Sequence, residues 1–302
     1  MRMEMRGPSF LRAWSLNGAR FAGKSREEEA RSLRWLRSLS DSDVDVPDVL
    51  CLQDFRVSLV SSLCALPYFC FVPMTNGWFF GQRELLGLCI ASRWPMNAME
   101  VEHTWGDGQI RDLQGVDEKN ARTGDPLESD RLVLATQNRV VVASTVMVPG
   151  WPHGVRVATH HGFWTRDGAS QAEQLESTKT AASFLQRQGL EHDGVLFMAD
   201  FNPDKEGHVC QIYRDSGAKD FLPRSIRTTL APEHPAARLG IRSDCVMAWP
   251  NAWGKMPFKA ISVYVDPSPG SDHLLIKAEF MRAFNDSLSG WNEPMRKTTI
   301  AQ

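Results

Sequence analysis

The sequence predicts an α/β (α+β) protein built as a four-layer αββα sandwich, with two packed mixed β-sheets flanked by helices. Two observations lead to this fold class. Short apolar runs of strand length alternate with longer segments of helical period, and several strand runs follow one another with no helix between them. The 302 residues contain no internal repeat and no low-complexity segment, which argues against a solenoid or a fibrous chain.

Two helices stand out in the hydrophobic pattern. Residues 25–39 carry Leu33 and Leu36 on one face, and residues 169–188 carry Leu175 and Leu185 on one stripe. Strands are expected over 10–16, 49–52, 85–91, 131–136, 139–148, 154–159, 195–199, 241–248, 260–265 and 274–280. Residues 105–130 lack an apolar period and are rich in Gly and Asp, so we expect a mobile surface loop there. We expect a single domain over 1–302, with its core at about 10–280 and a polar C-terminal tail over 282–302.

The composition is that of an ordinary globular enzyme. Hydrophobic residues make up 42% and charged residues 23% of the chain, and the net charge is -2. These values exclude a disordered chain and give no sign of the strong basic excess of many nucleic-acid-binding proteins.

The cysteines and the apolar segments bear on location. None of the six cysteines forms a C-x-x-C pair, and most lie in apolar runs, so we expect reduced thiols. The first residues lack an apolar core of signal-peptide length, and the most apolar stretch, 57–80, is interrupted by Pro67, Pro73 and Gly77. The expected location is intracellular and cytoplasmic, with no membrane span.

Five short polar segments stand at the ends of expected strands, where functional groups gather in α/β proteins. Taken singly, each segment is more often a turn, a cap or a buried polar group than a catalytic site. The segments are Trp14-Ser15-Leu16-Asn17-Gly18, Leu52-Gln53-Asp54, Thr159-His160-His161, Ala199-Asp200-Phe201-Asn202 and Ser271-Asp272-His273.

Together and in this order, the segments resemble the endonuclease/exonuclease/phosphatase superfamily, whose fold is that of deoxyribonuclease I. The resemblance covers roughly residues 10–280. Its most specific part is the pair Asp200-Phe201-Asn202 and Ser271-Asp272-His273. Between them, Asp244 on an apolar strand matches a strand of the family that carries an Asp. The resemblance implies that eight residues of these segments and strands converge in one cleft. They are Asn17, Asp54, His160, Asp200, Asn202, Asp244, Asp272 and His273.

The resemblance also implies a role for each residue. Asp54 and Asn17 would hold Mg²⁺, or Mn²⁺ in its place, and Asp272 would join them. Asp200 would activate the attacking water, and Asn202 would bind a phosphate oxygen or the nucleophile. His273, oriented by Asp244, would stabilise the charge that develops on the phosphate, and His160 would be a second imidazole there.

Three positions depart from the family pattern. Ser15 stands where the family has an Asn that contacts phosphate, Asp54 replaces a metal-binding Glu, and Ala199 replaces a Gly. These departures keep open a second reading, a catalytically impaired scaffold or binding protein of the same fold.

The function expected from the sequence is therefore Mg²⁺-dependent hydrolysis of phosphodiesters, as a nuclease or a nucleic-acid-related phosphodiesterase. The expected partner is nucleic acid or another phosphodiester, contacted by Ser15, Trp164 and Trp249. A phosphomonoesterase acting on a small or lipid phosphate is the alternative, because selectivity depends on loops that the motifs do not describe.

Overall fold

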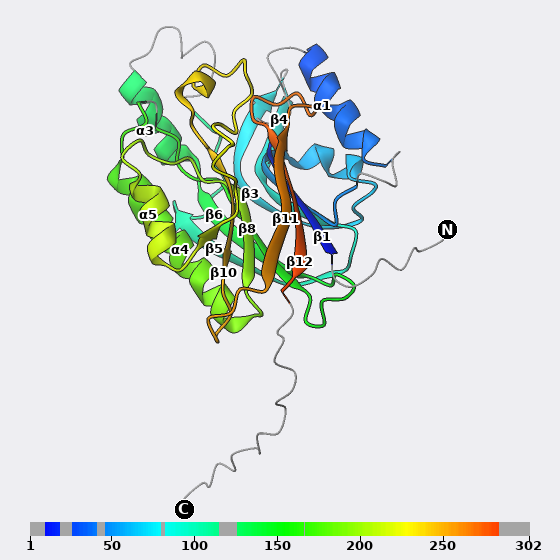
Figure 1. Cartoon of the computed structure of the whole chain (residues 1–302). Helices are drawn as coiled ribbons and strands as arrows, with labels where there is room; N and C mark the ends of the chain where they lie inside the picture. Colours follow the sequence, from blue (N-terminus) through cyan, green and yellow to red (C-terminus); the bar gives the residue numbers. More distant parts are fainter. Residues whose placement is uncertain are drawn as a thin grey trace, which may run out of the picture.

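Two six-stranded β-sheets face each other in the computed structural model (Figure 1). The structure describes residues 10–18, 26–40, 46–79, 82–114, 126–165 and 167–283. The sandwich predicted from the sequence is confirmed, with two mixed sheets between outer helices. In the first sheet the strand order is β11 (Phe258–Asp266), β12 (Leu275–Arg282), β1 (Phe10–Asn17), β2 (Val49–Arg56), β4 (Gln82–Ser92) and β3 (Tyr68–Phe79). In the second it is β5 (Met96–Trp105), β6 (Arg139–Val146), β7 (Val155–His160), β8 (Val195–Asp200), β10 (Asp244–Trp249) and β9 (Lys219–Asp220).

Each sheet has one parallel pair near its centre, β1 with β2 and β7 with β8. All other paired strands are antiparallel. Parallel neighbours end at the same edge of their sheet, so each sheet brings two strand ends together. Polar residues that follow these four strands can therefore meet.

Three apolar layers hold the sandwich together. The inner layer joins the two sheets and includes Leu11 and Cys51 from one sheet and Val157 and Met198 from the other. A second layer lies under α1 (Arg26–Ser38) and the 3₁₀ helix η2 (Val57–Ser62), and a third lies under α4 (Ala172–Glu191) and α5 (His208–Asp215). Figure 1 shows α1 on one outer side, with α4 and α5 on the other.

Strand periodicity explains how residues divide between these layers, because successive side chains point to opposite faces of a sheet. In β8, Leu196 and Met198 face the other sheet, whereas Phe197 and Ala199 pack under the helices. Full burial of a Leu, Met or Phe side chain stabilises the fold by about 1.5–3 kcal/mol.

One expected strand is wrong. Residues 131–136 lie in the helix α3 (Pro126–Thr136), although their apolar run also suited a strand. The same helix begins within the expected loop over 105–130, so residues 126–130 are helical. Residues 115–125 of that loop and residues 284–302 of the expected tail lie outside the described residues. None of the described helices combines the length and apolarity that a membrane crossing requires.

Candidate active site

The inward-facing stripes of four strands change from apolar to polar at one end of the sandwich. In β1 the stripe runs through Leu11, Ala13 and Ser15 to Asn17, and in β8 it runs through Leu196 and Met198 to Asp200. The same change occurs in β2 at Gln53 and just beyond β7 at His161. The candidate site is thus a polar continuation of the inner core, built where the two parallel pairs end.

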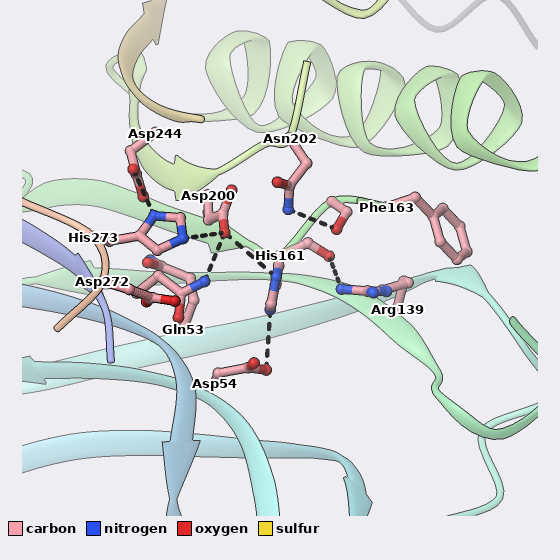
Figure 2. Close-up of polar contacts among 12 residues, drawn as sticks. Gln53, Asp54, Arg139, His161, Phe163, Asp200, Asn202, Asp244, Asp272 and His273 are labelled. Carbon is pink, nitrogen blue, oxygen red and sulfur yellow. Dashed lines mark hydrogen bonds and ion pairs between the residues drawn. The ribbon is translucent and has the colours of Figure 1, made fainter. Parts of the chain in front are cut away.

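Asp200 lies at the centre of this polar cluster (Figure 2). Its Oδ2 atom accepts a hydrogen bond of 2.6 Å from Asn17 Nδ2, across the gap between the two sheets. The same oxygen lies 3.4 Å from His161 Nε2 and 3.8 Å from His273 Nε2. The side chain is 1% exposed, and this burial raises the pKa of Asp200, although the two imidazoles and Asn17 act in the opposite direction.

The hydrogen bond expected between His273 and Asp244 is present. His273 Nδ1 lies 2.9 Å from Asp244 Oδ2, and Asp244 pairs in register with Asp200 on the neighbouring strand. Burial lowers the pKa of His273, but the carboxylates of Asp244 and Asp200 outweigh burial and raise it to about 10. His273 is therefore an imidazolium near neutral pH, with Nδ1–H directed to Asp244 and Nε2–H towards Asp200.

Asp54 reaches the cluster through an irregularity in β2. The pairing of β2 with β4 shifts register between Leu52 and Phe55, and Asp54 has a φ of 48°. This bulge turns Asp54 towards β7, where its Oδ1 lies 3.1 Å from His161 Nδ1. The imidazole of His161 lies between the carboxylates of Asp54 and Asp200 (Figure 2).

The expectation that His160 reaches the site is wrong, and His161 lies there instead. His160 shares the face of Ala158, so its ring points under α4, where Nε2 lies 3.1 Å from Thr104 Oγ1. Burial, with smaller contributions from Arg139 and His161, lowers the pKa of His160 to about 3, so the ring is neutral. His161 forms an isolated parallel bridge with Asp200, which places both side chains on the inward face.

Gln53 and Ser15 form a buried floor beneath the cluster. Gln53 Nε2 donates to Ser15 Oγ at 3.2 Å and to Thr159 Oγ1 at 2.8 Å. Ser15 is 1% exposed and already bonded, so the expected substrate contact by Ser15 has no support in this geometry. Gln53 was not among the expected site residues, although its inward position in β2 could have identified it.

The remaining expected residues separate into two groups. Asn202 and Asp272 lie at the cluster, where Asn202 is buried with a φ of 46° and Asp272 is exposed beside His273 (Figure 2). Trp164 is 57% exposed on the loop that follows His161. The expected substrate contact by Trp249 is wrong, because this side chain is buried at the opposite end of β10 against Phe197 and Tyr213.

The oxygen donors at the site suit a hard divalent cation, which prefers carboxylate and amide oxygens. Asn17, Gln53, Asp54 and Asp200 all offer such atoms. Asp200 Oδ1 and Gln53 Oε1 are buried without a hydrogen-bond partner among the described residues, so a cation or an ordered water would satisfy them. Within the same residues, Asp200, Asp244 and His273 lie close enough to share an ion, but a protonated His273 is a hydrogen-bond donor and not a ligand.

A second acidic group, Asp204 with Glu206 and His208, has a structural explanation. Both carboxylate oxygens of Asp204 accept backbone amides at the start of α5, from His208 at 2.9 Å and Val209 at 2.7 Å. Such bonds satisfy amides that a helix leaves unpaired at its N-terminus. Asp204 therefore caps α5, and its neighbours Glu206 and His208 lie beside this cap.

Comparison with known proteins supports the fold. No protein-family model matches the sequence, and no curated protein matches it. Solved structures do match. An endonuclease/exonuclease/phosphatase protein from Beutenbergia cavernae is 16% identical, with a TM-score of 0.59, over 91% of this chain and 72% of that one. TDP2 from D. rerio, humanised by 14 mutations, is 16% identical, with a TM-score of 0.57, over 90% of this chain and 98% of that one.

A third match is the 3′ phosphatase NExo from Neisseria, solved with a product DNA hairpin. It is 17% identical, with a TM-score of 0.56, over 89% of this chain and 99% of that one. The chain therefore has the fold of the endonuclease/exonuclease/phosphatase proteins.

Proposed function

We propose that this protein is a divalent-metal-dependent phosphodiester hydrolase that acts on nucleic acid or a nucleic-acid-linked phosphodiester. The observation that carries the proposal is the set of contacts on Asp200. Asn17, His161 and His273 all reach its Oδ2 atom, and they come from segments 183, 39 and 73 positions away in the chain. A buried carboxylate approached by two imidazoles and an amide is suited to general base catalysis.

Each group has a place in the attack of water on phosphorus. Asp200 takes a proton from water as the new P–O bond forms, and its raised pKa makes the carboxylate a stronger base. His273 donates through Nε2 to a phosphate oxygen and offsets the negative charge that develops there. Asp244 holds the ring by its Nδ1–H, and His161, in place of His160, protonates the leaving oxygen as the old P–O bond breaks.

We propose Mg²⁺ as the resident ion, with Mn²⁺ able to replace it, held by Asp54 and Asn17 with Asp272 beside them. When bound, the ion would supply positive charge to the phosphate oxygens. Asn202 would bind a further phosphate oxygen. The exposed ring of Trp164, three residues after His161, would stack on a base, which favours nucleic acid over a small phosphate.

Location and domain organisation belong to the same proposal. All six cysteines are free, as expected for a reducing compartment, so we propose that the protein acts in the cytoplasm. We also propose that the two sheets form a single domain, because they share the inner apolar layer.

A hydrolysis screen tests the proposal. Plasmid, single-stranded DNA, RNA, inositol phosphates and a bis-aryl phosphodiester are incubated with the protein in Mg²⁺, Mn²⁺ or EDTA. We expect cleavage of a phosphodiester in the metal-containing samples and its loss in Asp200→Asn, whereas Asp215→Asn, an exposed change on α5, retains activity. Cleavage of inositol phosphates alone would support the phosphomonoesterase reading instead.

Metal binding has a readout that needs no substrate. An ion that binds the native state raises the melting temperature, by an amount equivalent to about 2.7 kcal/mol at a hundredfold excess over Kd. We expect Mg²⁺ to stabilise the wild type and not Asp54→Asn. If Mg²⁺ does not change the melting temperature and no substrate in the screen is cleaved, the protein would instead be a scaffold or binding protein of this fold.

A further inference from the structure

Three consecutive carbonyls after β7 are each held by a buried side chain. The segment 161–163 carries the imidazole that lies between Asp54 and Asp200, so its backbone position sets the ring position. The hydrogen bonds are Arg139 Nη1 to His161 O at 3.1 Å, Asn202 Nδ2 to Gly162 O at 3.2 Å and Gln174 Nε2 to Phe163 O at 3.1 Å.

The bond from Arg139 differs from the other two because it brings a charge. Arg139 is 3% exposed, and its guanidinium carbon lies 5.0 Å from the centre of the Phe163 ring. Its Nε has no hydrogen-bond partner within the described parts of the chain. A cation buried in this way is costly unless opposite charges lie near it.

The opposite charges that act on Arg139 belong to the site itself. Burial lowers the pKa of Arg139 to about 10, while the carboxylates of Asp54 and Asp200 act in the opposite direction. In Figure 2 the guanidinium points to the backbone of His161, on the side of the ring away from His273. Arg139 therefore places a positive charge beside the backbone of His161, where it is attracted to both carboxylates.

We infer that Arg139 is a positioning residue of this site, whose guanidinium fixes the backbone of His161 and balances the negative charges of Asp54 and Asp200. The inference rests on the proposed function for what the site does, but the contacts exist without it. Lys can supply the charge but not the same hydrogen-bond geometry, because an ammonium is a compact point charge without the planar set of donors that guanidinium presents. Charge and geometry can thus be separated by substitution.

The first test follows the ring of His161 by NMR. Its imidazole signals in the wild type are assigned by their loss in His161→Gln, without any substrate. We expect them to shift or broaden in Arg139→Lys and in Arg139→Gln. Arg156→Lys is the matched control: Arg156 is also buried, 2% exposed, but pairs with Gln188 and Glu100 beside α4, so the His161 signals should not change.

The second test measures the charge. Melting temperatures are compared for Arg139→Gln, Asp200→Asn and the double variant. Loss of Arg139 should lower the melting temperature less in the Asp200→Asn background, because one of the two carboxylates it balances is already neutral. Arg139→Lys, which keeps the charge, should lower the melting temperature less than Arg139→Gln.

Activity supplies the third readout once the screen has found a substrate. We expect Arg139→Lys to lower kcat on the order of 10- to 100-fold with little change in KM, as displaced support groups do at other sites. If the wild type is inactive, the proposed function fails, while the spectra and the melting still decide the role of Arg139. Unchanged His161 signals in both folded variants, or equal melting shifts in the two backgrounds, would overturn the inference.

Discussion

The two oxygens of Asp200 have different surroundings, and the difference bears on what the residue can do. Oδ2 is contacted by Asn17, His161 and His273, whereas Oδ1 is buried with no hydrogen-bond partner in the described chain. An oxygen fixed by three groups orients the carboxylate, and the other is left to accept a proton. A carboxylate oriented by three neighbours, with one oxygen that accepts no hydrogen bond from the described residues, is suited to general base catalysis.

At the same scale, Asp244 should matter for turnover more than for folding. Asp244→Asn keeps the shape of the side chain but removes the charge that keeps His273 protonated on both nitrogens. We expect kcat to fall by roughly 10²–10⁴-fold, more than the loss of stability from breaking a buried ion pair explains. Asp220→Asn is the control, because Asp220 is an exposed residue paired with Arg242 on the same sheet. Full activity of Asp244→Asn would remove Asp244 from the mechanism.

His160 provides a prediction about pH and stability. The folded chain keeps this ring neutral down to about pH 3, whereas the unfolded chain protonates it near pH 6.5. The unfolded state therefore binds more protons between these values, so the free energy of unfolding falls as the pH is lowered, by about 2 kcal/mol between pH 6.5 and 5.

Replacing the ring removes this dependence. In urea titrations, His160→Gln should show a flatter stability profile between pH 6.5 and 5 than the wild type. His153→Gln, at an exposed position, should keep the wild-type profile. If the stability of His160→Gln falls with pH as steeply as that of the wild type, the buried ring does not cause the loss of stability.

The two neighbouring histidines also show where sequence reasoning stops at this scale. Both follow the same apolar strand, and a shift of one residue in the pairing register exchanges the inward and outward faces. Strand ends are uncertain by one or two residues in any sequence pattern. Only the bridge between His161 and Asp200 decides which ring faces the site.

At the scale of elements, strands with a clear apolar pattern and the polar residues at their ends were predictable from the sequence. Elements without a clear hydrophobic pattern were not. Only Thr104 of β5 is buried, and the strand mixes polar with apolar residues, so no stripe marks it as a strand. The apolar residues 132–135 belong to α3, since a short apolar run does not distinguish a strand from the end of a helix. The sequence predicts Trp249 near the site, but Trp249 ends a strand that begins there, roughly 17 Å further along at the rise of a β-strand.

Gly162, which directly follows His161 at the end of β7, gives a prediction about the segment that carries the ring. A Cβ atom at Gly162 would lie 2.4 Å from Phe201 O, so Gly162→Ala must displace the segment that carries His161. We expect a loss of about 1–3 kcal/mol in stability and a larger loss of activity than the stability change alone explains. Gly189→Ala is the control, because Gly189 lies in α4, away from the site. Its Cβ would make a similarly close contact, 2.7 Å from Pro250 O. Equal activity in the two variants would contradict the prediction.

At the scale of the whole molecule, the inner apolar layer makes the two sheets depend on each other. Leu11 and Cys51 have their buried neighbours partly in the opposite sheet, with Val157 and Met198. Neither sheet would keep this face covered alone, and exposed apolar faces of that size are unfavourable in water. The groups of the candidate site share this dependence, because Asn17 and Asp54 come from one sheet and Asp200 and His161 from the other or its connecting loop.

We therefore expect the chain to unfold in one cooperative transition, with equal calorimetric and van't Hoff enthalpies. Two truncations on opposite outer sides test this directly: Leu50→Ala under α1 and Leu185→Ala under α4, both at fully buried positions. Each should cost about 2–5 kcal/mol and move the same single transition to lower temperature, without splitting it. Two transitions, of which Leu50→Ala moves one and Leu185→Ala the other, would show that each sheet folds with its own helices and that the candidate site forms only where two independent units meet.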